Sequence, residues 1–303
     1  MPDWNELVNE TSALGTTYDI VRRKYLAELA THTGRNVIVY YSAWLQKGHL
    51  AQQGLTGFEV NDLDKNGLMA AIYGMDTSKG LDLILHTPGG DIAATESLVD
   101  YLRQKFGNDV RAIVPQLALS AGTMIALACG ELIMGRHSSL GPIDPQLGGA
   151  SAHAIVEEWK RAHVEIAAEP ARGMLWQLII NKYPPGLIGA AERAIEWATE
   201  IVTTWLSTGM LASRDDPVVA ATAVVDHLAS NTATKSHNRH LSADGLRKLG
   251  LDVTALEDDQ ALQSAVLTVH HACMLTLAEN PVLKLIENHN GISYNQMYEL
   301  GGR

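Results

Sequence analysis

Apolar and polar positions follow two patterns along the chain. One pattern predicts β-strands and the other predicts α-helices. Three short apolar runs, bounded by polar or glycine positions, have the length and composition of buried strands: 36–41, 81–85 and 110–114. Longer stretches with an apolar side and a charged side predict helices at 16–32 and 93–106. Because strand, helix and strand follow one another within about 30 residues, the pattern favours an α/β fold with a parallel sheet.

Past residue 150 the pattern becomes mainly helical. Helices are predicted over the stretches 152–161, 175–180, 188–206, 218–229, 260–277 and 282–287. The tail from 288 to 303 is expected to be a loop, ordered or disordered. Since no linker interrupts the sequence, we expect one domain made of an N-terminal helical segment (1–35), a core (36–150) and a helical extension (151–303).

Composition narrows the class of protein. The chain has 303 residues, of which 46% are hydrophobic and 19% charged, as in an ordinary soluble globular protein. The net charge of −11 disfavours nucleic acid as the main partner, because binding a phosphate backbone requires clustered Lys and Arg. The N-terminus lacks the pattern of a secretory signal, and no run of about 18 uncharged apolar residues follows. Cys129 and Cys273 lie in apolar helical surroundings, which indicates buried free thiols and a reducing cytoplasm.

Residues that could take part in catalysis follow the ends of two predicted strands. Gly89 and Gly90 follow the strand 81–85, and glycines leave backbone N–H groups open to a ligand such as an oxyanion. Ser120 follows the strand 110–114 and opens an alanine-rich helix, whose N-terminus favours negative charge beside it. The two strand ends therefore offer an oxyanion hole and a nucleophile.

Three motifs occur in a fixed order: Thr87-Pro88-Gly89-Gly90, Ser120-Ala121-Gly122-Thr123 and Ser139-Leu140-Gly141-Pro142-Ile143-Asp144-Pro145-Gln146. In their order and spacing the chain resembles the Clp protease/crotonase superfold, and most closely the serine dehydrogenase proteinase family, which is related to signal peptide peptidase A. The resemblance implies a core of repeated β-β-α units with a parallel sheet. It also implies a serine peptidase that forms an acyl-enzyme on Ser120, with an oxyanion hole from the backbone N–H groups of Gly90 and Ala121.

The resemblance extends to partners. It implies a polypeptide or peptide substrate, no cofactor, and a homo-oligomer that is a trimer or a hexamer, with an ATPase or a membrane protein as a further partner. Two alternatives stay open, because a fold does not determine a function. One is a catalytically inactive scaffold of the same fold, and the other is a crotonase-like acyl-CoA enzyme.

The general base is left open by the sequence. Where Clp subunits have a histidine, this chain has Asp144, and an aspartate near its ordinary pKa cannot replace that base directly. One option is a Ser–Lys dyad with Lys160, provided that burial lowers the pKa of the lysine. The other, proposed for the family, is a Ser–Asp–His arrangement in which Asp144 orients a histidine. The candidates are His137, His153, His163, His237 and His240, of which His137 and His240 are retained as alternative bases.

No metal site is expected. The histidines lack the spacing and the neighbouring carboxylates of a zinc-binding helix. The segment 62–67 resembles the start of a calcium-binding loop, but Tyr73 stands at the twelfth position, where a glutamate is required. We therefore interpret Asp64 or Asn66 as the N-terminal cap of a helix over 67–73.

Overall fold

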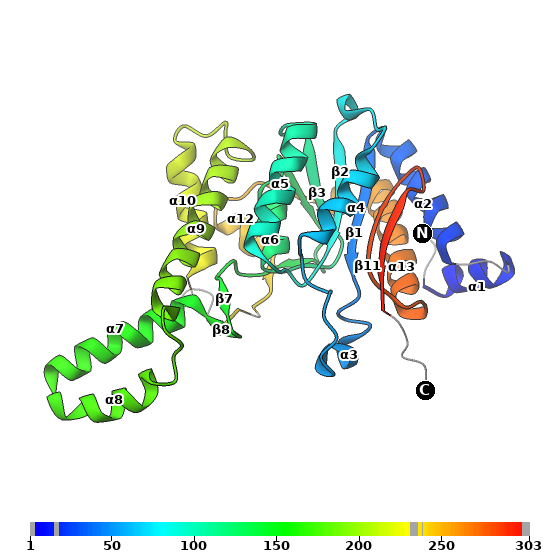
Figure 1. The fold of residues 1–303 in the computed structure, drawn as a ribbon. Coiled ribbons are helices and arrows are strands. Elements are labelled where there is room, and N and C mark those ends of the chain that lie inside the picture. The colour runs from blue at the N-terminus through cyan, green and yellow to red at the C-terminus, as the bar shows by residue number, and fades with distance from the viewer. Residues whose placement is uncertain (1–3, 15–17, 231–235, 238, 299–303) are drawn as a thin grey trace.

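The computed structural model describes residues 4–14, 18–230, 236–237 and 239–298. Helices pack on both faces of one large sheet, so that the molecule has three layers (Figure 1). The described residues contribute seven strands to this sheet, in the order β10-β5-β3-β2-β1-β11-β12. Their bounds are β1 Asn36–Ser42, β2 Leu81–His86, β3 Val110–Val114, β5 Glu131–Met134, β10 Val253–Ala255, β11 Val282–Asn288 and β12 Ser293–Met297.

The sheet is parallel over most of its width. The pairs from β10 through β5, β3 and β2 to β1 are parallel, whereas β11 and β12 add two antiparallel strands beyond β1. The predicted strands 36–41, 81–85 and 110–114 all form, and the α/β class with a parallel sheet is confirmed. Because β2 and β3 are parallel neighbours, the two turns that carry the candidate chemistry leave the same edge of the sheet.

Each face of the sheet is covered by its own helices. One face packs against α4 Leu63–Ile72, α5 Ile92–Phe106, α6 Ala121–Leu127, α9 Leu187–Thr208, α10 Pro217–Ala229 and α12 Ala243–Lys248. The other face packs against α2 Tyr18–Thr33 and α13 Gln260–Glu279, with α1 Trp4–Leu14 outside them. Cys129 and Cys273 are buried free thiols, as predicted.

Among the described residues α13 is the one helix that is long and apolar enough to cross a membrane. This differs from the expectation that no such stretch exists. Half of the apolar window of α13 is buried, and the helix packs closely along α2 and over the sheet. Its composition is therefore that of a core helix, which must be apolar on more than one side.

The C-terminal part contains strands where the sequence predicts a helix and a loop. The segment 282–287 forms β11 instead of a helix, and β12 lies within the predicted tail. Every residue of β11 is buried, including Lys284 and Glu287, so its pattern does not show the alternation of a half-exposed strand. These two charges are balanced by distant partners, Asp64 for Lys284 and Arg22 for Glu287.

Asp64 belongs to the core rather than to a cation loop. The helix α4 begins at Leu63, earlier than the predicted helix, so that neither Asp64 nor Asn66 is its cap. The buried Asp64 carboxylate lies 2.8 Å from Lys284 Nζ and accepts a hydrogen bond from the Tyr40 hydroxyl at 2.7 Å.

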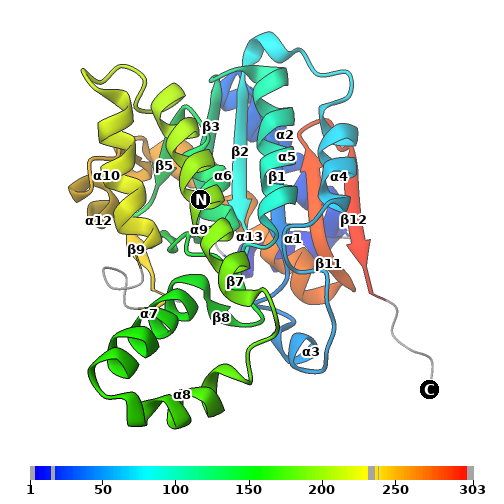
Figure 2. The ribbon, with the colours of Figure 1, turned by 60° about the vertical axis from the view of Figure 1, so that its left-hand side comes forward.

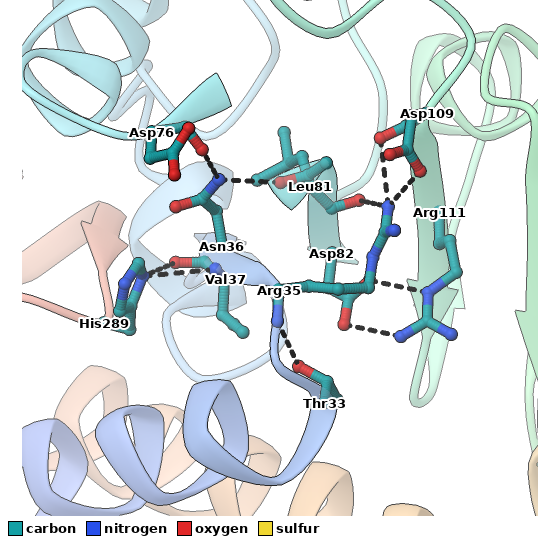
Figure 3. Close-up of polar contacts among 11 residues, drawn as sticks. Thr33, Arg35, Asn36, Val37, Asp76, Leu81, Asp82, Asp109, Arg111 and His289 are labelled. Carbon is teal, nitrogen blue, oxygen red and sulfur yellow. Dashed lines mark hydrogen bonds and ion pairs between the residues drawn. The ribbon is translucent and has the colours of Figure 1, made fainter. Parts of the chain in front are cut away.

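A polar network joins the amino ends of the three central strands (Figure 3). The fully buried Asp82 of β2 lies between Arg35, which precedes β1, and Arg111 of β3. Asp82 Oδ1 is 2.8 Å from Arg35 Nε and 2.7 Å from Arg111 Nε. Arg35 also reaches Asp109 at 2.7 Å. This network holds the strands together at the edge opposite to the candidate site.

A helical arm projects from the body of the molecule (Figure 1, Figure 2). It consists of α7 Ala152–Ala168 and α8 Gly173–Ile180, and it is joined to the body through α9. Short strands lead into it and border the candidate site: β4 Leu117–Ala118, β6 Ser139–Leu140, β7 Gln146–Leu147, β8 Ala150–Ser151 and β9 Leu241–Ser242. A short helix, α3 Gly48–Gln52, lies in the loop after β1.

Candidate active site

The diglycine turn and the turn of Ser120 are in contact. Gly89 has φ +101°, and a Cβ atom at this position would lie 2.6 Å from the Cβ atom of Ser120 and 2.9 Å from the backbone N of Ala121. At Gly90 a Cβ atom would lie 2.3 Å from the backbone N of Val60. Contacts below 3 Å leave no room for a side chain, so both positions require glycine.

The backbone around these turns is fixed by hydrogen bonds that do not use the N–H groups of Gly90 and Ala121. Val60 N donates to Gly89 O at 2.7 Å, Asp91 N donates to Val60 O at 2.9 Å, and Gly122 N donates to Leu119 O at 2.8 Å. The two turns are therefore held rigidly against each other by bonds in which these two N–H groups take no part, a setting that suits stabilisation of an oxyanion.

Ser120 has an unusual backbone conformation. With φ +50° and ψ −116°, it has the one positive φ among the described non-glycine residues. Such a conformation costs roughly 1–3 kcal/mol and persists only where the surrounding structure imposes it. Ser120 is partly exposed and immediately precedes α6, so its hydroxyl lies at the positive end of a buried helix.

Thr123 connects the Ser120 helix to the loop that carries Asp144. Its hydroxyl oxygen lies 2.9 Å from Ala118 O and accepts a hydrogen bond of 2.9 Å from Gly141 N. A Cβ atom on Gly141 would be 3.2 Å from the Leu119 side chain, so the two segments are in contact. The loop from Gly141 to Asp144 is thereby held against the turn of Ser120.

Asp144 is fully buried and carries two side-chain hydrogen bonds. Its Oδ2 atom accepts a hydrogen bond from Gln146 Nε2 at 2.9 Å. Its Oδ1 atom lies 2.6 Å from Nδ1 of His237. A carboxylate bonded to one ring nitrogen orients the imidazole and leaves the other nitrogen for a proton transfer.

Two non-local contacts explain why His237 reaches Asp144. Ile143 N donates a hydrogen bond of 3.1 Å to Leu228 O at the end of α10, and Leu241 of β9 pairs with Leu140 of β6. The chain between residues 228 and 241 is therefore anchored at both ends beside the Asp144 loop. The sequence offers His237 only as one histidine of five, because nothing local signals these two pairings.

The other candidate bases lie elsewhere. Lys160 is exposed on α7, so the burial on which the dyad depends is absent. His240 is exposed, and the exposed His137 lies beside Gly135. His163 is exposed and packs edge-on against the Trp159 ring. Hence Asp144 is paired with His237 rather than with either alternative base retained from the sequence.

His153 is a second histidine near Asp144. Ala152 N donates a hydrogen bond of 2.8 Å to Pro145 O, which brings the start of α7 against the Asp144 loop. Burial lowers the pKa of His153, and the Asp144 carboxylate acts in the opposite direction. Its ring is thus part of the electrostatic surroundings of Asp144, while the hydrogen bond to the carboxylate belongs to His237.

His86 is the last residue of β2, three positions before Gly89, and its side chain is buried. Its ring lies 4.3 Å from that of Trp44 and 5.6 Å from that of His270, between centroids. Burial lowers the pKa of His86 to about 3, so this residue is neutral at physiological pH. In the described part of the chain, no three His, Cys, Asp or Glu side chains are arranged to hold a metal ion.

Comparisons with known proteins show which sequences and structures the chain is similar to. Residues 13–261 match the family described as ClpP-like SDH-type serine proteinase. Two uncharacterized proteins of Methanocaldococcus jannaschii are similar to the chain. MJ0137 is 36% identical over 143 residues, and this alignment covers 46% of this chain and 47% of that protein. MJ1495 is 30% identical over 190 residues, and this alignment covers 63% of this chain and 57% of that protein. The chain thus spans about half the length of these curated relatives.

Among solved structures, a mutant of the 1510-N membrane-bound stomatin-specific protease is similar, with 17% identity and a TM-score of 0.40 over 68% of this chain and 79% of that one. This likeness is too distant to support a conclusion. The family match, by contrast, covers most of the chain and contains all three motifs. The chain therefore belongs to the ClpP-like SDH-type serine proteinase family.

Proposed function

We propose that the protein is a serine peptidase that hydrolyses peptide bonds through an acyl-enzyme on Ser120, with His237 as general base and Asp144 as the residue that orients it. The observation that carries this proposal is the 2.6 Å contact between His237 Nδ1 and the buried Asp144 Oδ1, on the loop held against the Ser120 turn. A buried carboxylate stabilises an imidazolium ion, which is the state that a general base reaches during catalysis.

The reaction would proceed in two stages. His237 Nε2 accepts the Ser120 hydroxyl proton while Oγ attacks the scissile carbonyl carbon, and the resulting oxyanion accepts hydrogen bonds from the N–H groups of Gly90 and Ala121. Collapse of this intermediate releases the amine, which takes the proton from His237, and leaves the acyl group on Ser120. Water then attacks the ester while His237 takes its proton, and the acyl–oxygen bond breaks as Ser120 Oγ takes that proton back from His237, which releases the carboxylic acid and regenerates the enzyme.

The two rival functions make less use of the residues present. A crotonase-like acyl-CoA enzyme would use the paired amides but would not need Ser120 in a strained turn beside an Asp–His pair. An inactive scaffold would not need an oriented imidazole together with Ser120 in a strained turn. We further propose that the substrate is a polypeptide or peptide, that the active form is an oligomer, and that it works in the cytoplasm, where the buried thiols stay reduced.

A fluorophosphonate probe tests the proposal, because it reacts covalently with a serine that a neighbouring base activates. We expect labelling of the full chain at Ser120, identified by peptide mass spectrometry, and loss of labelling in Ser120→Ala and in His237→Gln. Ser97, a hydroxyl on α5 bonded to Lys65, provides the matched control, and Ser97→Ala should label as the wild type does. A wild-type protein that stays unlabelled, or a His237→Gln variant labelled at the wild-type rate, would contradict the proposal.

A further inference from the structure

The Asp144 carboxylate is held at both of its oxygen atoms. Oδ1 lies 2.6 Å from His237 Nδ1, and Oδ2 accepts a hydrogen bond of 2.9 Å from Gln146 Nε2. The same Gln146 nitrogen lies 3.4 Å from the backbone oxygen of Asp144. Since this carboxylate is fully buried, hydrogen bonds must replace the water that it would otherwise bind. The proposed mechanism uses the bond at Oδ1 and gives the glutamine no role.

The backbone of Gln146 is fixed on both sides. Gln146 begins β7, which pairs antiparallel with β8. Gly148 and Gly149 connect the two strands with φ values of +60° and +85°, and two positive φ angles in succession are what a tight hairpin turn requires. On the other side, Pro145 O accepts a hydrogen bond of 2.8 Å from Ala152 N at the start of α7. The amide of Gln146 therefore approaches Asp144 from a fixed position.

We propose that Gln146 is a positioning residue, whose amide holds the Asp144 carboxylate with Oδ1 toward His237 and sets how firmly the pair binds a proton. This inference rests on the proposed function of the pair. An N–H donor at Oδ2 offsets part of the negative charge of the carboxylate, so it weakens the attraction of Asp144 for an imidazolium ion. The donor thus favours the neutral imidazole, which is the form that can accept the proton of Ser120.

Other titratable groups lie on the elements around the pair. They belong to α7, to the end of α10 and to the stretch after His237: His153, Glu157, Lys160, Asp226, His227, Arg239 and His240. Burial lowers the pKa of His153, while Asp144 and Glu157 act in the opposite direction. Replacements of Gln146 leave all of these groups in place. A change in the titration of His237 that follows the charge at position 146 can therefore be assigned to that position.

Nuclear magnetic resonance tests the proposal on the full chain labelled with ¹⁵N-histidine, in which His237→Gln identifies the signal of His237. We expect its titration midpoint to move to higher pH by about 0.5–1 in Gln146→Leu, because one hydrogen bond to the carboxylate is lost. Gln146→Glu should move the midpoint further in the same direction, since it adds a negative charge beside Oδ2. Gln146→Lys keeps a donor and adds a positive charge, so its midpoint should lie below that of the wild type.

Gln177, an exposed glutamine on α8, provides the matched control, and the same three replacements there should leave the midpoint of His237 unchanged. Circular dichroism checks that all variants are folded. A positioning role also predicts that the pH midpoint of fluorophosphonate labelling at Ser120 shifts in the same order, which a loss of stability alone would not produce.

Two results would overturn the inference. One is an unchanged midpoint of His237 in Gln146→Leu, which would mean that water supplies the same hydrogen bond. The other is an equal set of shifts in the Gln177 series. Because the titration requires no activity, the two proposals fail separately. Ordered shifts in a protein that is never labelled would contradict the proposed function alone, whereas a labelled protein without these shifts would contradict the role of Gln146 alone.

Discussion

His237 Nδ1 lies 2.6 Å from Asp144 Oδ1, although the two residues are separated by 93 positions in the sequence. The carboxylate is fully buried and the imidazole is partly exposed, so the pair connects the interior with the surface of the protein. Such a pair can pass the proton of a serine hydroxyl to a leaving group only if its free ring nitrogen faces that hydroxyl.

Replacing either member of the pair should abolish most of the peptidase activity. We expect His237→Gln and Asp144→Asn to lower kcat by about 10³-fold or more on a peptide substrate, because the imidazole loses either its basicity or its orientation. Steady-state kinetics of the folded variants measures this loss.

Two other variants serve as controls for the choice of base. His240→Gln removes a neighbouring exposed histidine, and Lys160→Gln removes the lysine of the dyad hypothesis. Both should retain kcat within a few-fold of the wild type. If Lys160→Gln lost activity as Ser120→Ala does while His237→Gln kept it, the assignment of the base would be wrong.

Gly89→Ala should lower both stability and activity. The added methyl group would collide with Ser120 and would impose an unfavourable φ on alanine, which together cost about 2–4 kcal/mol in the free energy of unfolding. Gly34→Ala is the matched control, since Gly34 also has a positive φ but nothing within 4 Å of the added atom. Urea denaturation should show about 1 kcal/mol of destabilisation for the control, with unchanged activity. Similar losses in both variants would contradict a close contact between the two turns.

The Asp82 network should contribute to stability and not to catalysis. Asp82→Asn leaves Arg35 and Arg111 without their shared counter-charge, which should lower the free energy of unfolding by about 2–4 kcal/mol (Figure 3). Asp109→Asn affects an ion pair whose carboxylate is 57% exposed, so it should cost less than about 1 kcal/mol. The midpoints of urea denaturation measure both losses. Equal midpoints for the two variants would contradict the expectation that Asp82→Asn destabilises the protein more than Asp109→Asn does.

Stability should fall as the pH decreases from 6.5 toward 3. In this window His86 binds a proton in the unfolded chain, where its pKa is 6.5, but not in the folded protein, where burial lowers its pKa to about 3. The unfolded state therefore binds more protons, and the free energy of unfolding decreases by roughly 1.4 kcal/mol per pH unit through this residue. Burial lowers the pKa of His270 as well, which adds to the effect.

His86→Phe isolates this contribution, because phenylalanine can keep the ring packing against Trp44 without titrating. Denaturation measured between pH 4 and 6.5 should give a shallower dependence for the variant, by about one proton per molecule. A pH dependence identical to that of the wild type would show that His86 is not responsible.

Local signals in the sequence were enough to predict the two turns that carry Ser120 and the paired glycines, and the structure brings these turns into contact. Paired glycines after an apolar run, and a serine before an alanine-rich helix, report on backbone conformations that are decided within a few residues. The parallel sheet was predicted from short apolar runs that alternate with amphipathic helical stretches. The strand β11 was mistaken for a helix because Lys284 and Glu287 lie inside the sheet, where Asp64 and Arg22 neutralise them.

Only the tertiary structure decided which histidine accompanies Asp144. His237 stands in a polar stretch that has no pattern of its own, and its position depends on the pairing of β9 with β6 and on the contact of Ile143 with Leu228. These contacts join segments about 85–100 residues apart, and their energies depend on the packing of the whole chain. Backbone turns are thus encoded locally in this protein, whereas the partner of its buried carboxylate is determined by long-range strand pairing.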